Sequence, residues 1–207
     1  MISIITLTPA LLNTEEVWAQ FTVIPIKVGE HPQNVEYNPS NGNMYVSNSG
    51  SGDISIIDSN TNKVIHTIQV GSGSDTSPDA LKYNPSNGDM YGTSVSDSDG
   101  SGNVFILDNS TNKVIRTIDG GDNIHNLVYN PSNGNMYGTS ISNSDGTGKV
   151  IVIDSDTDKV LQTVDVGDNP VDIKYNPSNG DIYVVNENSD DVSLITTSKT
   201  NSTNTTN

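Results

Sequence analysis

Tyr37-Asn38-Pro39-Ser40-Asn41-Gly42 is a phrase that occurs four times in this chain of 207 residues, and its spacing decides the fold. The other copies begin at Tyr83, Tyr129 and Tyr175, so every step between copies is 46 residues. Six identical residues that recur at a constant interval are typical of a repeat architecture, in which each repeat is one supersecondary unit. The chain therefore carries four tandem repeats.

Each repeat contains four strand-like segments separated by turn residues. In the first repeat they cover residues 34–37, 44–47, 54–57 and 64–70. Proline fixes φ and Asn-Gly supplies the positive φ of a tight hairpin, whereas no window shows useful helical periodicity. Four up-and-down strands per repeat form the blade of a propeller, so we expect an all-β, four-bladed β-propeller.

The fourth repeat lacks its last strand, and the chain offers a substitute at its other end. Residues 22–28 match that missing strand, because Val28-Gly29 aligns with Val70-Gly71. We expect this N-terminal strand to complete the last blade, since closing the ring removes an exposed sheet edge. The predicted propeller covers residues 21–197, with blades at about 30–70, 76–119, 122–166, and 168–196 plus 22–28. A fragment of a longer propeller and a half-ring that dimerises are the alternatives.

The two ends of the chain differ from the repeats in composition. Residues 1–20 are predicted to be a leader or a truncated signal peptide, with an apolar start but no preceding Lys or Arg. Residues 198–207 are Thr, Asn, Ser and Lys, which predicts a disordered tail. Glycosylation sequons begin at Asn109, Asn201 and Asn204.

Charge and composition exclude several classes of function. The chain has 9 basic and 25 acidic residues, a net charge of −16, which repels phosphate backbones and argues against nucleic acid as a partner. The absence of cysteine excludes disulfides, Cys-ligated zinc and thiol catalysis. The apolar start of the chain is too short to cross a bilayer, so no transmembrane span is expected.

The repeats agree with one another except at fixed positions before the repeated tyrosine, which propeller topology places at the rim of the central channel. Such divergence on a repetitive scaffold is where a specific site could be built, although exposed loop positions can also drift freely. The candidate ligand-binding residues are His31, Gln33, Asn34, Asp79, His125, Asn126, Asp168 and Asp172.

The sequence allows two kinds of metal site. His31 and His125 with Asp79, Asp122, Asp168 and Asp172 could supply nitrogen and oxygen ligands, the alternative being ordinary hydrogen-bonded surface pairs. Residues 97–103 and 143–148 gather oxygen-bearing side chains around glycine, which indicates a weak calcium site at Asp97, Asp99 and Asp145 or a hairpin turn without metal. Calcium or another divalent cation is thus the one cofactor indicated.

Tyr45-Val46-Ser47-Asn48 and Tyr183-Val184-Val185-Asn186 each follow an Asn-Pro-Ser-Asn-Gly turn, and they resemble the repeat of the YVTN-family β-propellers. The two middle repeats depart from it, reading Tyr-Gly-Thr-Ser from Tyr91 and Tyr137. The resemblance covers about residues 22–196. It implies an exported scaffold or binding role, as in surface-layer proteins, and carries no catalytic motif.

The sequence therefore favours a non-catalytic, extracellular or cell-surface binding or structural module, present as a monomer or weak oligomer. A protein or a glycan at the cell surface is the expected partner. No nucleophile elbow and no phosphate-binding Gly-Lys-Ser/Thr motif occurs. The alternative is a metal-dependent hydrolase or lyase at the channel rim, which needs His31 or His125 and at least two carboxylates around one point.

Overall fold

A computed structural model describes residues 21–73 and 75–196, and within them it contains fifteen β-strands and no helix. Sheet 1 consists of β1 (Pro32–Asn38), β2 (Asn43–Asn48), β3 (Asp53–Asp58) and β4 (Lys63–Gln69). Sheet 2 consists of β5 (Thr76–Tyr83), β6 (Met90–Ser96), β7 (Ser101–Asp108) and β8 (Lys113–Asp122). Sheet 3 consists of β9 (Ile124–Asn130), β10 (Asn135–Ile141), β11 (Gly148–Asp154) and β12 (Lys159–Val166). Sheet 4 has three strands, β13 (Pro170–Tyr175), β14 (Ile182–Asn186) and β15 (Asp191–Ile195).

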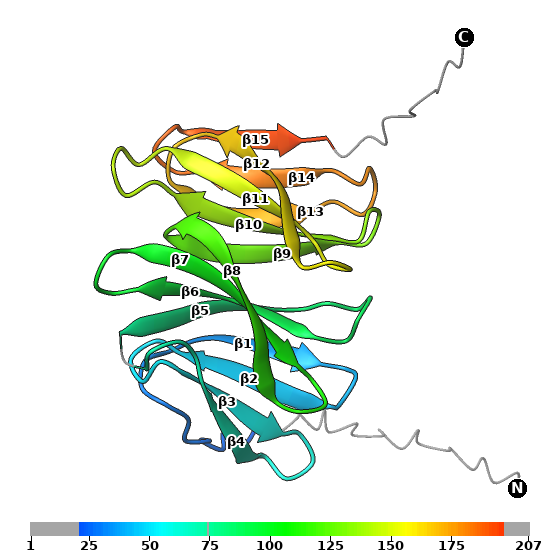
Figure 1. The fold of residues 1–207 in the computed structure, drawn as a ribbon. Helices are drawn as coiled ribbons and strands as arrows, with labels where there is room; N and C mark the ends of the chain where they lie inside the picture. Colours follow the sequence, from blue (N-terminus) through cyan, green and yellow to red (C-terminus); the bar gives the residue numbers. More distant parts are fainter. Residues whose placement is uncertain (1–20, 74, 197–207) are drawn as a thin grey trace, which may run out of the picture.

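Each sheet is an antiparallel meander of one sequence repeat, as the spacing predicts. Figure 1 shows the four sheets following one another in sequence order, with sheets 2 and 3 between sheets 1 and 4. The first strands of neighbouring sheets, β1, β5, β9 and β13, lie next to one another. They therefore form the inner side of the arc, and any rim site must be built at their ends. Because the described residues contain no helix, they contain none that could cross a membrane.

The repeated turns explain why each repeat folds into hairpins. In the Tyr-Asn-Pro-Ser-Asn-Gly turn the first Asn side chain accepts a hydrogen bond from the Ser backbone at 2.9 Å in every copy. The glycine of each copy has φ between 75° and 85°, which a residue with a Cβ rarely adopts. The turn is thus specified locally, by side chain and backbone together.

A second repeated turn, Asp-x-x-Thr, joins the third and fourth strands of sheets 1 to 3. The Oδ1 atoms of Asp58, Asp108 and Asp154 accept the backbone N–H of the Thr three residues later, at 2.7, 2.7 and 2.9 Å. Hydrogen bonds from the Ser110 hydroxyl and from Thr111 lower the pKa of Asp108 to about 2. The ionised carboxylate is therefore the form that holds the turn.

Apolar residues lie between sheets rather than inside any single one. Three clusters fill the junctions of sheets 1 and 2, 2 and 3, and 3 and 4. At the first junction Tyr45 and Ile54 of sheet 1 face Leu81 and Phe105 of sheet 2. Burying one sheet face against the next lets a chain with 32% hydrophobic residues form a core.

Tyrosine hydroxyls tie the sheets together at the edge of each apolar cluster. The hydroxyl of Tyr45 donates to Asn112 Oδ1 at 3.1 Å, and that of Tyr91 donates to Asp158 Oδ1 at 2.7 Å. Burial raises the pKa of Tyr91 far above its ordinary value, so its hydroxyl keeps the proton that it donates. Each bond connects the second strand of one sheet to the Asp-x-x-Thr turn of the next.

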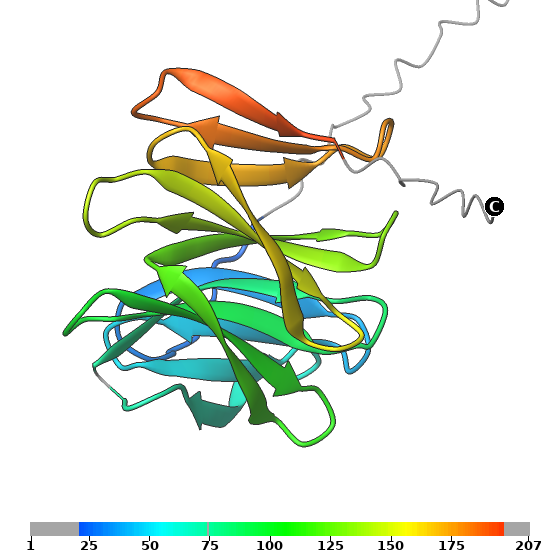
Figure 2. The same ribbon diagram turned by 45° about the horizontal axis from the view of Figure 1, so that its top comes forward.

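The predicted closure of the ring within one chain is wrong. Residues 21–28 form no strand, and within the described residues sheet 4 ends at β15 without a fourth strand. Figure 2 likewise shows no strand beside the outer edge of β15 in the described part of the chain. The physical reason is that three junctions turn the chain through only part of a circle, which leaves sheets 1 and 4 apart.

The predictions for the two termini lie largely outside the described residues. The leader at 1–20, the tail at 198–207 and the sequons at Asn201 and Asn204 cannot be compared with the structure for that reason. The third sequon lies in a turn, where the Asn109 Nδ2 atom donates to the Gly88 carbonyl at 2.6 Å. Glycosylation replaces one of the two Nδ2 hydrogens, so this bond does not exclude a glycan on Asn109.

We expect Asp108→Ala to lower the melting temperature at pH 7, by roughly 3 °C or more, because the turn loses its acceptor. The folded-state pKa of Asp108 is about 2, below the ordinary Asp value of about 3.9. Its contribution is therefore complete above about pH 4, and the difference between variant and wild type should shrink as the pH falls toward 2. Thermal melts from pH 2 to 7 measure this. Asp165→Ala, at an exposed site on β12, is the control and should leave the melting temperature at pH 7 close to that of wild type.

Tyr91→Phe should lower the free energy of unfolding by about 1.5–3 kcal/mol, since it removes a buried hydroxyl that donates to a carboxylate. Urea unfolding followed by circular dichroism measures the loss. Tyr129→Phe is the matched control, because its hydroxyl has no hydrogen-bond partner among the described residues and its loss should cost under about 0.5 kcal/mol. Equal effects of the two variants would contradict the role assigned to the Tyr91–Asp158 bond.

Candidate functional site

The candidate site is built on a β-bulge that recurs at the start of the first strand of every sheet. In β1 and β13 the pairing with the next strand skips Gln33 and Val171. In β5 and β9 it skips Asp79-Ala80 and His125-Asn126. A bulge takes a residue out of the ladder and re-aims its side chain. The four residues at the equivalent position, Gln33, Asp79, His125 and Val171, are therefore all presented at the rim.

Side-chain hydroxyls of the second strands fix the two central bulges. The Ser47 hydroxyl donates to the carbonyl of Asp79, and the Thr93 hydroxyl donates to that of His125 at 2.8 Å. Each donor belongs to one sheet and each acceptor to the next. The bulges of sheets 2 and 3 are thus held in place across the junctions as well as within their own sheets.

Asp79 and His125 come together between two hollows. The His125 Nδ1 atom lies 3.1 Å from Asp79 Oδ2, and both side chains are partly exposed. A hollow of about 360 Å³ on one side is lined by Gln33, Ser49, Ser77, Pro78, Asp79, Val95, Asp97 and His125. A hollow of about 290 Å³ on the other side is lined by Asp79, His125, Asn126, Ile141, Asn169, Pro170 and Val171. The pair therefore joins side chains of all four sheets into one rim surface.

Of the eight predicted rim residues, four line this surface: Gln33, Asp79, His125 and Asn126. Gln33 donates from Nε2 to the Ser49 hydroxyl at 3.0 Å, and Asn126 donates from Nδ2 to the Val171 carbonyl at 3.0 Å. Both amides thus retain further donor or acceptor capacity for a ligand.

The other four predicted residues lie elsewhere. His31 packs against Gly50 in the loop after β2, and Asp168 is exposed with its backbone N–H on Ser189 Oγ at 2.7 Å. Asn34 follows the bulge and donates its backbone N–H to Ser47 Oγ at 3.1 Å. Asp172 pairs with Lys174 at 2.7 Å. No three His, Asp or Glu side chains in the described part of the chain come close enough to hold one metal ion.

The three predicted calcium-loop residues act within their own neighbourhoods. Asp97 Oδ1 accepts the Ser77 hydroxyl at 2.8 Å beside the larger rim hollow. Asp99 accepts the Ser101 backbone N–H at 2.9 Å, and Asp145 accepts that of Thr147 at 3.1 Å. Hydrogen bonds within these turns lower the pKa values of both carboxyl groups. The largest effect on Asp99 comes from Ser101, and the largest effect on Asp145 comes from Ser142. Both carboxylates therefore stabilise the turns in which they lie.

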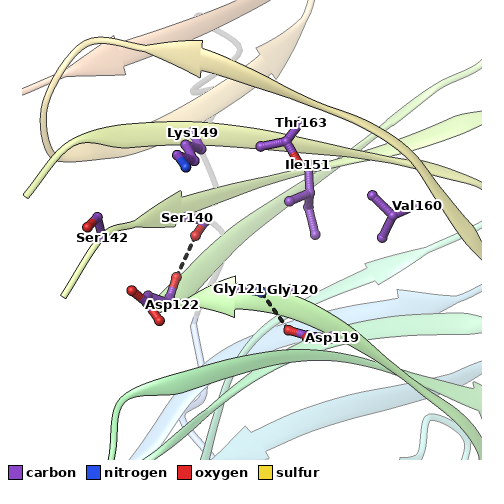
Figure 3. A pocket seen from close by; sticks show the side chains of 10 residues that line it. All are labelled: Asp119, Gly120, Gly121, Asp122, Ser140, Ser142, Lys149, Ile151, Val160 and Thr163. Atoms are coloured by element: carbon purple, nitrogen blue, oxygen red, sulfur yellow. Dashed lines mark hydrogen bonds between the residues drawn. The ribbon is translucent and has the colours of Figure 1, made fainter. Parts of the chain in front are cut away.

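A third hollow, of about 510 Å³, lies between sheets 2 and 3 and was not predicted (Figure 3). Asp122 and Lys149 lie at one end of it, whereas Ile151 and Val160 form an apolar side. Its signal in the sequence is Gly120-Gly121, which stands where other repeats have Val70-Gly71 or Val166-Gly167. The second repeat thus has glycine where the first and third have valine, and the junction of sheets 2 and 3 differs from the others for this reason.

Comparison with known proteins identifies the fold and nothing finer. No known family profile matches the chain, and no curated protein matches it in sequence. Hydrazine synthase of Kuenenia stuttgartiensis is similar in structure over 74% of this chain and 43% of its own, with 19% identity and a TM-score of 0.65. A putative 6-phosphogluconolactonase of Bacteroides uniformis is similar over 79% of this chain, with 13% identity and a TM-score of 0.62. The Dos1 propeller is similar over 83% of this chain, with 15% identity and a TM-score of 0.60.

This chain spans 50% of the length of the lactonase-like structure and 49% of the Dos1 propeller, about half in each case. Four antiparallel sheets in sequence order, with their first strands side by side, are also the arrangement of propeller blades. The chain has a β-propeller fold.

Proposed function

We propose that this protein is an exported, non-catalytic propeller that binds a small hydroxyl-rich ligand, such as a cell-surface glycan, at the His125–Asp79 rim. The observation that supports this most directly is the pair itself, which lies between two hollows lined by residues of all four sheets. Export and a place at the cell surface rest on the resemblance to the YVTN-family repeat.

The chemistry of the rim favours a neutral or cationic polyol over an anion. Asp79 and Asp97 accept hydrogen bonds, while His125, Gln33 and Asn126 can donate them. Hydroxyl groups both donate and accept, so sugars match such a mixed lining. Val171, which is 42% exposed beside the smaller hollow, adds apolar surface on which a sugar ring can lie. Volumes of about 290 and 360 Å³ are at the lower end for small-molecule sites and fit one or two sugar rings.

We expect His125→Ala and Asp79→Ala each to weaken sugar binding by about 10-fold, which corresponds to one strong net hydrogen bond. The measurement is a backbone amide NMR titration with N-acetylglucosamine, galactose and glucosamine and their disaccharides. His66→Ala, on the outer strand β4, is the matched control and should leave binding unchanged. Failure of every sugar to shift the amides of sheets 1 to 4 at the rim would contradict the proposal.

A metal-dependent hydrolase or lyase is the second candidate, favoured by the same His125–Asp79 pair, which could supply two metal ligands. One similar structure is named a putative 6-phosphogluconolactonase, which shows that this fold occurs in a protein considered to be an enzyme. A catalytic zinc site has three protein ligands. The described residues bring no third His, Asp or Glu to the pair.

We therefore expect the purified protein to contain no stoichiometric metal and to show no rise in melting temperature with 1 mM zinc, manganese or calcium. Elemental analysis and thermal melts test this, with His125→Ala as the comparison. A bound metal or a stabilisation that disappears in His125→Ala would favour the enzyme over the binding module.

A further inference from the structure

Two sheet faces at the ends of the arc expose apolar side chains. On sheet 1, the face turned away from sheet 2 exposes Val35 by 55% and Tyr37 by 49%, both on β1, whereas Val46 and Ile57 farther out on this face are 7% exposed. On sheet 4, the face turned away from sheet 3 exposes Val192 by 55% and Leu194 by 52%. These are the two outermost surfaces of the stack in Figure 1.

The positions of Val35 and Val192 are buried wherever a neighbouring sheet covers them. Val35 corresponds to Leu81, Leu127 and Ile173, which are exposed by 3%, 8% and 2%. Val192 corresponds to Ile54, Val104 and Val150, because all four pair with the same position of the second strand of their sheet. Ile54, Val104 and Val150 are all 0% exposed. The two uncovered faces are therefore the unmatched halves of one interface, which this chain forms three times within itself.

We propose that a second copy of this chain covers both faces, so that sheet 4 of each copy packs on sheet 1 of the other and two half-rings close into one propeller of eight sheets. The occupant follows from the repeats, because the surface that fits each end is the surface at the opposite end of the same chain. A head-to-tail contact that closes after two copies leaves neither face exposed.

Hydrogen bonds at the internal junctions predict those at the new one. Ser40 Oγ lies 2.7 Å from Tyr83 Oη at the first junction, and Ser132 Oγ lies 2.8 Å from Tyr175 Oη at the third, whereas Tyr129 at the second junction makes no such bond among the described residues. The next pair in this series is Ser178 with Tyr37 of the second copy. The Tyr45–Asn112 and Tyr91–Asp158 bonds likewise continue as Tyr183 with Asn62 of the second copy.

The segment before β1 is already placed as the end of a preceding sheet. A Cβ on Gly29 would lie 2.8 Å from Asn48 Cβ, and one on Gly167 would lie 2.8 Å from Asn186 Cβ. The backbone N–H groups of Glu30 and Asp168 donate to equivalent serines, Ser51 and Ser189, at 3.0 and 2.7 Å. Residues 21–28 thus approach sheet 1 as β12 approaches sheet 4.

In the closed pair of copies, residues 22–28 would supply the missing fourth strand of sheet 4, along the unpaired edge of β15. Ile26 aligns with Ile68 and Ile118, which are exposed by 7% and 8%, and would then be covered. Residues 22–28 resemble the last strand of a repeat, and in this arrangement they complete sheet 4 of the other copy instead of sheet 4 of their own.

Charge acts in two directions on this contact. The net charge of −16 on each copy opposes association at long range. Within one copy, Glu36 of sheet 1 pairs with Lys82 of sheet 2 at 3.0 Å. At the new junction Lys174 of sheet 4 occupies the position equivalent to Glu36, and it would face Glu36 of the second copy. Salt screens the long-range repulsion more than it weakens apolar contact, so added salt should strengthen the pair.

The test is the mass of the full 207-residue chain in solution, by light scattering and sedimentation velocity from 1 to 100 µM. We expect twice the 22.0 kDa of one chain, with a dissociation constant that falls as NaCl rises from 50 to 500 mM. The mass of one chain at 100 µM, or a series of larger head-to-tail assemblies, would overturn the proposal.

Single charges at the two faces locate the contact. Val192→Asp and Val35→Asp should each raise the dissociation constant by about 100-fold or more, because both copies of the interface would bury an unpaired carboxylate. Both sites are more than half exposed in one copy, so circular dichroism and melting of the monomer should be unchanged. Ile115→Asp, at a residue exposed by 54% on the outer strand β8, is the matched control and should leave the mass at two chains.

Mixing the two variants distinguishes head-to-tail closure from any symmetric face-to-face contact. In a mixed pair one junction contains both aspartates and the other contains neither, so an equimolar mixture should associate more tightly than either variant alone, through the intact junction. A mixture that associates no more tightly than either variant, or a wild-type dimer that neither variant weakens, would overturn the proposal.

Discussion

The structure depends on burial of one sheet face against the next. A single four-stranded sheet of this composition has no core of its own, because its apolar side chains project from its two faces. The third strands show the consequence, since β3, β7 and β11 are buried almost throughout while the outer strands β4, β8 and β12 are mostly exposed. Stability is therefore shared between neighbours, and a sheet without a neighbour leaves apolar surface in water.

The rim surface follows from the same arrangement. Because the first strands lie side by side, one bulge repeated in each strand places four variable side chains around one opening. All four repeats keep the bulge, and the hydroxyls of Ser47 and Thr93 anchor the two central ones, while Gln33, Asp79, His125 and Val171 differ in chemistry. A constant backbone thus carries a variable surface, which is how a repeat scaffold acquires a specific site without changing its fold.

Much of the fold could be predicted because its determinants are local. The two repeated turns, the strands and the variable position of Asp79 and His125 all follow from neighbouring residues in the chain. His31 was misplaced because its position belongs to the linker before β1. There it has φ of 49°, and Asn123 and Asn169 have 33° and 51° at the same position in later repeats. That backbone conformation favours Asn and His for local reasons, so variation there reflects turn geometry and not a ligand.

The misassigned partner of residues 22–28 shows the limit of sequence reasoning more clearly. Alignment states which strand a segment resembles, and it says nothing about which copy of the chain provides the sheet. Deciding that requires the angle between successive sheets, which depends on how the side chains of each junction fill their space. If two copies complete the ring, the bulges at Gln33 and Val171 meet across the new junction as those at Asp79 and His125 do within one copy. The rim would then run unbroken around the channel, with two His125–Asp79 pairs on opposite sides. A monomeric variant that still binds sugar would show that one half of this rim is sufficient, which separates ligand recognition from ring closure.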